Sequence, residues 1–154
     1  MLTSLSSVPS SFGPADDHSP WQGDSAESEK PIFRKTAHPK RVLVVEDHPD
    51  SARSLAVLVR SMGHEADYAI NGYVGLALMR EFRPDVVLLD LGLPGLTGFE
   101  VCARIKADPA NKHVRVSAIT AYPQDHYRLR SAEVGFDLHL LKPVPIRVLE
   151  DLLG

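Results

Sequence analysis

Five short apolar runs, each followed by a segment with helical periodicity, constrain the fold of this chain more than any other feature. The apolar residues of RVLVVE (41–46) are continuous rather than alternating, and DVVLLD (85–90) is the strongest strand prediction. Continuous runs of this kind are typical of strands that are covered on both faces. The strands are predicted at 41–46, 65–69, 85–90, 114–120 and 137–141.

The intervening segments have the spacing of amphipathic helices. In 50–63, Leu55, Leu58, Val59 and Met62 fall on one helical face, and Gly63 is a natural helix end. The helices are predicted at 50–63, 73–82, 98–108, 125–135 and 145–153. Strict alternation of strand and helix predicts an α/β fold, a five-stranded parallel, doubly wound sheet with helices on both faces.

The chain divides near residue 40. Residues 1–39 are rich in serine and proline and show no sustained apolar period, so we predict a disordered N-terminal tail. Trp21 and the segment PIFRK (31–35) could instead dock on a partner or on the domain. Residues 40–154 contain all five strand–helix pairs and form the predicted domain, and a chain with 44% hydrophobic residues can bury a core of this size.

Composition excludes several classes of partner. The formal net charge of −3 gives no global basic field for nucleic acid, and no apolar run approaches the roughly 20 residues that span a bilayer. The N-terminus lacks the pattern of a secretory signal. The single cysteine, Cys102, rules out an internal disulfide, fits a reducing cytoplasm and is expected to be small core filler. We therefore expect a cytoplasmic protein with no direct nucleic-acid or membrane partner.

Charged and polar residues follow four of the predicted strands. Glu46 and Asp47 follow the first strand, Asp90 ends the third, Thr120 ends the fourth and Lys142 follows the fifth. In parallel sheets of this kind ligands bind outside the carboxyl ends of the strands, so these side chains should meet at one edge. Three carboxylates together favour a hard divalent cation such as Mg²⁺, and a lysine with a hydroxyl could hold a phosphoryl group.

The sequence closely resembles response-regulator receiver domains in the segments VLVVEDHPD, VVLLDLGLPGLTGFE, AIT and LLKPV, in order and at suitable spacing. The resemblance covers Lys40 to about Leu153. It implies a flavodoxin-like (βα)5 receiver fold in a single-domain response regulator that is not a turnover enzyme. Asp90 would accept a phosphoryl group from a sensor histidine kinase or a histidine phosphotransfer protein.

The resemblance also implies a Mg²⁺ site. Asp47 would hold the ion directly, Glu46 mainly through water, and the backbone carbonyl of Gly92 would be a further ligand beside Asp90. The loop after Asp90 carries three glycines, which would let backbone groups approach the metal and the phosphate closely.

Further residues receive roles in phosphoryl binding by the same resemblance. Lys142 would contact one phosphoryl oxygen and Thr120 another, and Pro143 matches a position where the family has a cis peptide bond. Gly92 and Tyr122 match positions that influence how readily water reaches the phosphoryl group. We hypothesise that Tyr122 shields this group and lengthens its lifetime.

One position departs from the commonest family pattern. Where the family usually has Tyr or Phe, whose rotation accompanies phosphorylation, this chain has His139. An imidazole is smaller and titrates near neutrality, so His139 is either a modified switch or a static strand residue. Histidine at this position is reminiscent of receivers associated with hybrid sensor kinases.

Other interpretations of these residues remain. Asp47 or Asp50 could cap the following helix, and His48 is interpreted as a loop residue rather than a metal ligand. A phosphatase of the haloacid dehalogenase type would need an acid two residues after Asp90, where this chain has Gly92. A receiver-like scaffold that binds partners without phosphorylation is the main alternative function.

The output is expected to be made through another molecule, because no DNA-binding or enzymatic segment follows LLKPV in the sequence. The family resemblance implies a downstream protein target on the surface of the fourth helix, fifth strand and fifth helix, roughly 124–153. The segment HYRLR (126–130) would give this surface some positive charge, although a solvated helix face is the simpler interpretation.

Overall fold

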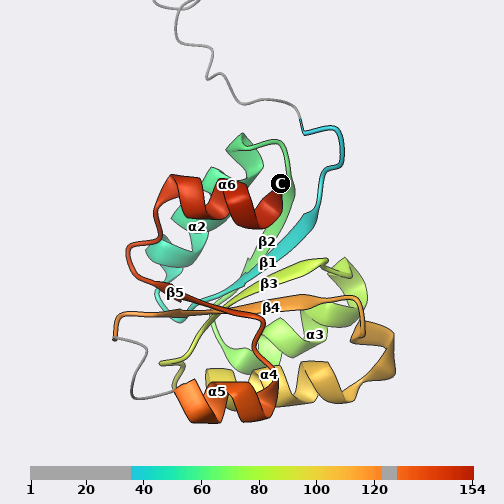
Figure 1. Cartoon of the computed structure of the whole chain (residues 1–154), viewed down its shortest axis with the longest axis vertical. Coiled ribbons are helices and arrows are strands. Elements are labelled where there is room, and N and C mark those ends of the chain that lie inside the picture. Colours follow the sequence, from blue (N-terminus) through green and yellow to red (C-terminus); the bar gives the residue numbers. More distant parts are fainter. Residues whose placement is uncertain (1–35, 123–127) are drawn as a thin grey trace, which may run out of the picture. The chain divides into compact units, whose positions relative to one another are not determined.

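The computed structural model describes residues 36–122 and 128–154, and in this part of the chain strands and helices alternate as predicted (Figure 1). The strands are β1 (Arg41–Val45), β2 (Glu65–Ala69), β3 (Val86–Asp90), β4 (Arg115–Thr120) and β5 (Leu138–Leu141). The helices are α2 (Pro49–Ser61), α3 (Gly72–Phe82), α4 (Gly98–Ala107), the 3₁₀ helix η2 (Pro109–Asn111), α5 (Arg128–Val134) and α6 (Ile146–Leu153).

The predicted elements are confirmed, with small differences at their ends. Only η2 was not predicted; Pro109 starts it and the Asp108 side chain accepts a hydrogen bond from Ala110 N at 2.9 Å. The first residues of the helix predicted at 125–135 lie outside the described residues. Nearly all of the predicted tail (1–39) also lies outside the described residues, including Trp21 and the segment 31–35. Within the described ranges, no helix is both long and apolar enough to cross a membrane.

The five strands form one parallel sheet in the order β2-β1-β3-β4-β5. The chain moves outward from β1 to β2 and then crosses back to β3 on the other side of β1. This reversal makes a switch point between β1 and β3, beside which ligands bind in doubly wound sheets. The predicted parallel, doubly wound architecture is therefore confirmed.

Helices cover both faces of the sheet, with α2 and α6 on one face and α3, α4 and α5 on the other (Figure 1). Successive strand residues point to opposite faces, so Val42 and Val44 pack with α2 and α6, and Leu43 and Val45 pack with α3 and α4. Burial on both faces explains why the apolar runs are continuous in the sequence.

Cys102 lies in the second of these two cores. Its side chain is fully buried on α4, and burial raises the pKa of its thiol to about 12. A thiol that stays protonated and inaccessible is a packing residue rather than a nucleophile, which confirms the expected role of core filler.

Candidate functional site

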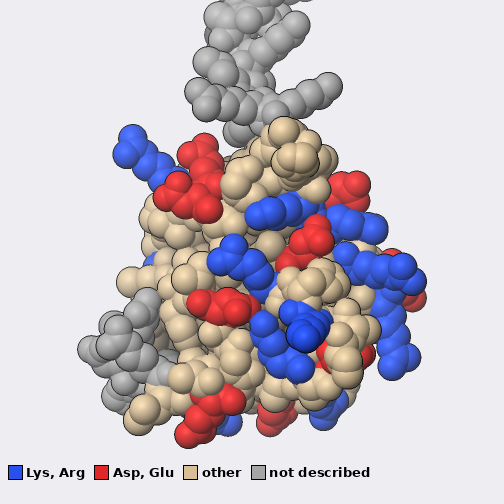
Figure 2. Space-filling model, turned by 45° about the vertical axis from the view of Figure 1, so that its right-hand side comes forward, with Lys and Arg blue, Asp and Glu red and all other residues tan. Residues whose placement is uncertain are grey.

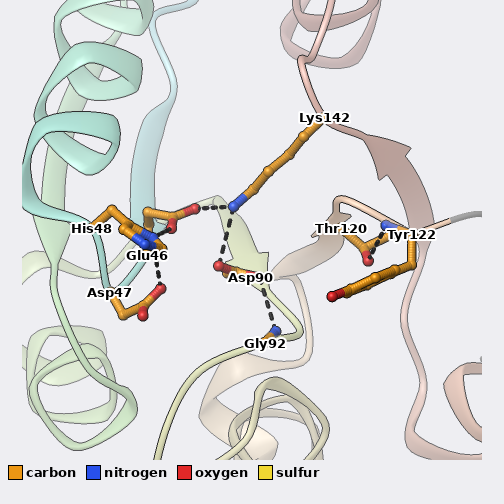
Figure 3. Close-up of polar contacts among 8 residues, drawn as sticks. All are labelled: Glu46, Asp47, His48, Asp90, Gly92, Thr120, Tyr122 and Lys142. Atoms are coloured by element: carbon orange, nitrogen blue, oxygen red, sulfur yellow. Dashed lines mark hydrogen bonds and ion pairs between the residues drawn. The ribbon is translucent and has the colours of Figure 1, made fainter.

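The carboxyl ends of the strands bring the predicted polar residues to one edge of the sheet (Figure 3). Glu46 follows β1, Asp90 is the last residue of β3, Thr120 is the last residue of β4, and Lys142 follows β5. The prediction that these strand-end residues meet is confirmed. Glu46, Asp90 and Thr120 are also buried, with exposed fractions of 5%, 7% and 3%.

Lys142 joins the two buried carboxylates. Its Nζ donates hydrogen bonds to Glu46 Oε2 at 2.5 Å and to Asp90 Oδ2 at 3.1 Å (Figure 3). Burial alone would lower the pKa of Lys142, but the hydrogen bonds to Glu46 and Asp90 outweigh burial and raise it. The ammonium therefore stays charged and compensates carboxylates that would be unfavourable to bury alone.

The loop after β3 holds the Asp90 carboxylate from the other side. Gly92 N donates a hydrogen bond to Asp90 Oδ1 at 2.9 Å. At Gly98, where α4 begins, an added Cβ would lie 2.3 Å from the backbone oxygen of Asp90 and 2.9 Å from Leu91 Cα. A side chain at residue 98 would therefore push the helix away from the end of β3. The glycine sets the path of the loop that presents Gly92 to Asp90.

His48 also belongs to the site, although the sequence analysis interpreted it as a loop residue rather than a metal ligand. Its Nδ1 lies 3.0 Å from Glu46 Oε1 and 3.2 Å from Asp47 Oδ1. The hydrogen bond with Glu46, together with the charge of Asp47, raises the pKa of His48. The sequence feature that could have indicated this contact is the position of His48 directly after Glu46 and Asp47.

The capping interpretation of Asp47 is wrong. His48 is the residue before α2, its side chain makes no capping hydrogen bond, and Pro49 occupies the first helical position. Asp50 lies in the first helical turn, where a carboxylate favours the helix dipole. The Asp47 side chain faces the site instead (Figure 3).

Thr120 and Tyr122 form the wall of the site on the β4 side. Tyr122 N donates a hydrogen bond to Thr120 Oγ1 at 3.1 Å, which leaves the hydroxyl hydrogen of Thr120 able to donate to an oxygen in the site. The Tyr122 side chain is 65% exposed. In Figure 3 its ring lies beside Thr120 and its hydroxyl points toward the side of Asp90.

His139 and Pro143 lie on either side of Lys142 along the chain. His139 is half-buried in β5, with its ring centroid 5.6 Å from that of Phe136. The switch and the static interpretation of His139 both remain predictions. The Lys142–Pro143 peptide bond is cis, as the resemblance implied.

The donor set fits a hard cation. Glu46, Asp47 and Asp90 supply carboxylate oxygens, and Lys142 offers one positive charge against three negative ones. Ligand atoms of Glu46, Asp47 and His48 lie within 4.8 Å of one another. Oxygen-rich sites with excess negative charge suit Mg²⁺, which keeps several of its waters.

Comparison with known proteins agrees with this arrangement. The family model of the response regulator receiver domain matches residues 42–153. Polar-differentiation response regulator DivK of Brucella anthropi is 33% identical over 108 residues, which are 70% of this chain and 88% of DivK. Response regulator PleD of Caulobacter vibrioides is 36% identical over 104 residues, 68% of this chain, and the chain spans only 23% of PleD.

A solved structure has the same fold. The receiver domain of sensor histidine kinase PA1611 from Pseudomonas aeruginosa, described with a magnesium ion coordinated in its active site cleft, superposes with a TM-score of 0.68. It is 26% identical in sequence, and the match covers 75% of this chain and 95% of that one.

Proposed function

Since the chain belongs to the response regulator receiver domain family, we propose that it is a single-domain response regulator that accepts a phosphoryl group on Asp90. Receiver domains are signalling domains rather than turnover enzymes. The observation that carries the proposal is the position of Asp90, buried at the end of β3 and bound by Lys142 and by Gly92 N. The match across 88% of DivK supports the single-domain assignment.

In the proposed reaction an oxygen of Asp90 attacks the phosphorus of a phosphohistidine on a sensor histidine kinase or a histidine phosphotransfer protein. A P–O bond to Asp90 forms while the P–N bond breaks, and the electron pair of that bond returns to the imidazole of the donor. Such transfers pass through a loose transition state, so positioning and charge compensation do most of the catalysis. Lys142 supplies a fixed positive charge, and the Gly92 amide holds the carboxylate in place.

A Mg²⁺ ion is the proposed cofactor. Asp47 and Asp90 would hold it directly, Glu46 mainly through water, and Gly92 through its backbone carbonyl. When bound, the ion would supply positive charge to the phosphoryl oxygens. The excess of carboxylates at the site supports this assignment, as does the magnesium ion described for the PA1611 receiver.

Thr120, Lys142 and Tyr122 are proposed to act once Asp90 is phosphorylated. The Thr120 hydroxyl would donate to one phosphoryl oxygen and the Lys142 ammonium to another. Tyr122 would cover the mouth of the site and slow the approach of water, in line with its exposed ring beside Thr120. Tyr122→Ala is expected to shorten the lifetime of the phosphorylated protein; a decay rate equal to that of the parent would contradict the shielding role.

The signal is proposed to leave through a protein contact on α5, β5 and α6. Leu138, Leu141 and Ile146 are 40%, 49% and 52% exposed, so β5 and the start of α6 present apolar side chains to solvent. This surface would move when Lys142 and His139 move, because these residues lie on or next to β5. The single buried cysteine is consistent with the cytoplasm as the proposed location.

The test is intact-mass measurement of the protein after incubation with a small-molecule phosphodonor, with Mg²⁺ and with a chelator. We expect one Mg²⁺-dependent phosphoryl adduct in the parent and none in Asp90→Asn. Asp50→Asn is the matched control, because it removes an exposed carboxylate in the first turn of α2, and it should be phosphorylated like the parent.

Two results would contradict the proposal. An adduct that persists in Asp90→Asn would assign the phosphoryl group to another residue. A parent protein that gains no adduct under any condition would favour the alternative function, a receiver-like scaffold that binds partners without phosphorylation.

A further inference from the structure

The two acids that follow β1 have a nitrogen donor beside them. His48 Nδ1 lies 3.0 Å from Glu46 Oε1 and 3.2 Å from Asp47 Oδ1 (Figure 3). Within the part of the chain that the structure describes, these three side chains are the one group of at least three whose ligand atoms lie close enough to share a metal ion, and Asp90 is not a member. The closest set of ligands therefore includes an imidazole, which the Mg²⁺ site proposed above does not use.

The spacing of these atoms is that of ligands around one ion. Metal ions bind imidazole nitrogen and carboxylate oxygen at about 2.0–2.2 Å, so neighbouring ligands in octahedral or tetrahedral geometry lie about 2.8–3.6 Å apart. Both distances from His48 Nδ1 fall within this range. Without a metal, Nδ1 must carry a proton to lie so close to two carboxylates. A divalent ion could take the place of that proton with little movement of the side chains.

Glu46 can bind an ion on this side without losing Lys142. Its Oε2 accepts the hydrogen bond from Lys142 Nζ, whereas its Oε1 faces His48. The hydrogen bond from Lys142 to Asp90 uses a different carboxylate. An ion between Glu46 Oε1 and His48 would therefore leave both contacts of Lys142 in place.

The fold itself gives His48 little to do. It is the residue before α2, where a side chain commonly caps the helix, but its side chain makes no capping hydrogen bond. The side chain is 73% exposed, so burial does not hold the ring in place. Its contacts with the two acids are what orient it. Compared with a lysine or arginine in the same place, an imidazole adds a nitrogen that can bind a metal ion.

From this geometry we propose that Glu46, Asp47 and His48 bind Zn²⁺, with His48 Nδ1 as a direct ligand. Imidazole nitrogen suits Zn²⁺, whereas Mg²⁺ prefers oxygen ligands and keeps several of its waters. The inference rests on the proposed function, because it concerns the same metal site and both ions would use Asp47. It assigns to His48 the choice between the two ions.

A histidine at the opposite edge of the sheet gives a matched control. His113, just before β4, is exposed and lines a groove together with Arg80, Arg83 and Arg104. Positive side chains are common away from the site, and Figure 2 shows a face of the molecule on which many Lys and Arg side chains gather. Positive surroundings disfavour a bound cation. His113→Asn therefore removes an imidazole where we expect no Zn²⁺ site.

The test is calorimetric titration of the full chain with Zn²⁺ and, separately, with Mg²⁺, at about pH 8, where protons compete little with a metal for imidazole. His48→Asn should bind Zn²⁺ about tenfold or more weakly than the parent, since even the loss of a partner behind a ligand costs about 10–100-fold. It should bind Mg²⁺ at least as tightly as the parent, because no carboxylate is lost. Asparagine is favoured before a helix, so the variant should fold as stably as the parent.

Nitrogen NMR of the histidine rings separates coordination from an effect of charge alone. The Nδ1 signal of His48 is the one that is missing from His48→Asn. In the parent this signal should shift when Zn²⁺ is added, because the nitrogen binds the ion directly. His113→Asn should retain both the shift and the Zn²⁺ affinity of the parent.

Three results would overturn the inference. If His48 acts only as a charge paired with the acids, its removal takes away a competing positive charge, and His48→Asn will bind Zn²⁺ as tightly as the parent or more tightly. An Nδ1 signal that does not shift would exclude direct coordination. Equal losses of Zn²⁺ affinity in His48→Asn and His113→Asn would mean that Zn²⁺ binds histidines without a defined site.

The Mg²⁺ titration separates this inference from the proposed function. A parent that binds Mg²⁺ but gives one of these three results would lose only the Zn²⁺ assignment, and the site proposed for phosphorylation would stand. A parent that binds neither ion would contradict both proposals.

Discussion

The central strand β3 and the edge strand β5 both lead to a charged residue of the site, but they are held very differently. All five residues of β3 are buried, and β1 and β4 bind it on both sides. β5 is bound only by β4, and Leu138 and Leu141 are exposed. Asp90, the proposed acceptor, is therefore held on a fully buried strand that is paired on both sides, whereas Lys142, its counter-ion, follows an element with a free edge.

This difference suits the two tasks of a receiver domain. A phosphoryl acceptor must be held rigidly, because misplacement of the reacting oxygen reduces the rate of transfer. A signalling surface must change when the acceptor is modified, and regions that move are those with fewer buried contacts. The link between the two is the hydrogen bond from Lys142 to Asp90, which joins the edge strand to the central one.

The largest expected effect is on stability. Leu88→Ala, in the fully buried middle of β3, should lower the free energy of unfolding by about 2–5 kcal/mol, because it leaves a cavity in the core between the sheet and the helices α2 and α6. Leu141→Ala, on exposed β5 surface, should change it by only about 0.5 kcal/mol. Urea denaturation measures both. Equal losses of unfolding free energy in the two variants would mean that side chains of β3 and β5 contribute equally to stability, contrary to the difference described above.

A pair of glycine variants tests how the end of β3 is held. Gly98→Ala should lower the free energy of unfolding by about 1–3 kcal/mol, because the new Cβ would clash with the Asp90 and Leu91 backbone. Gly92→Ala is the control, since its Cβ would meet only Asp90 Oδ1 at 3.6 Å. Denaturation of the two variants side by side gives the difference. If Gly98→Ala is as stable as the parent, the loop does not fix the end of β3.

At the start of β5, Asp137 tests what holds the edge strand. Its Oδ2 accepts hydrogen bonds from Val116 N at 2.7 Å and from Lys106 Nζ at 2.9 Å. Asp137→Ala should lower the free energy of unfolding by about 1–2 kcal/mol, because Val116 N is buried and loses its acceptor. Asp137→Asn keeps an acceptor and should lose less. Identical losses in the two variants would mean that the ion pair with Lys106, not the amide contact, anchors β5.

The other edge strand, β2, can be compared through the pH dependence of stability, where we expect the smallest effect. His64 is buried just before β2, and its Nδ1 accepts a hydrogen bond from Lys40 N at 3.0 Å. Burial, and next the charge of Lys40, lower the pKa of His64.

The direction of the pH effect follows from this lowered pKa. The unfolded chain binds a proton near pH 6.5, before the folded protein does, so stability is complete above pH 6.5 and falls as the pH drops toward the folded pKa. Denaturation at several pH values between neutrality and pH 5 should show a smaller decline in His64→Gln than in the parent. If stability declines equally in His64→Gln and in the parent, His64 is not the cause of the decline.

Much of the fold could be predicted from the sequence, because its signals are local. The continuous apolar runs of β1 and β3 reflect burial on both faces, and Gly63, with a φ of 93°, lies just beyond the end of α2, as expected of a helix stop. The strand-end residues could also be located, because parallel strands all present their carboxyl ends to one edge. The 3₁₀ helix η2 was missed because a three-residue element has no periodicity.

The contacts within the site were less accessible to prediction. The position of Asp90 followed from its strand, but the contacts of His48 with Glu46 and Asp47 depend on a side-chain conformation that no sequence pattern specifies. The resemblance assigned Lys142 to phosphoryl binding, whereas its hydrogen bonds to both Glu46 and Asp90 require the completed sheet.

The sequence by itself therefore determined the order and type of the elements and the residues at each strand end, since periodicity and burial act within a few residues. Only the tertiary structure decided which of those residues touch, because contacts such as that between Glu46 and Lys142 join positions 96 residues apart. Packing of distant elements, and not local preference, brings such side chains together.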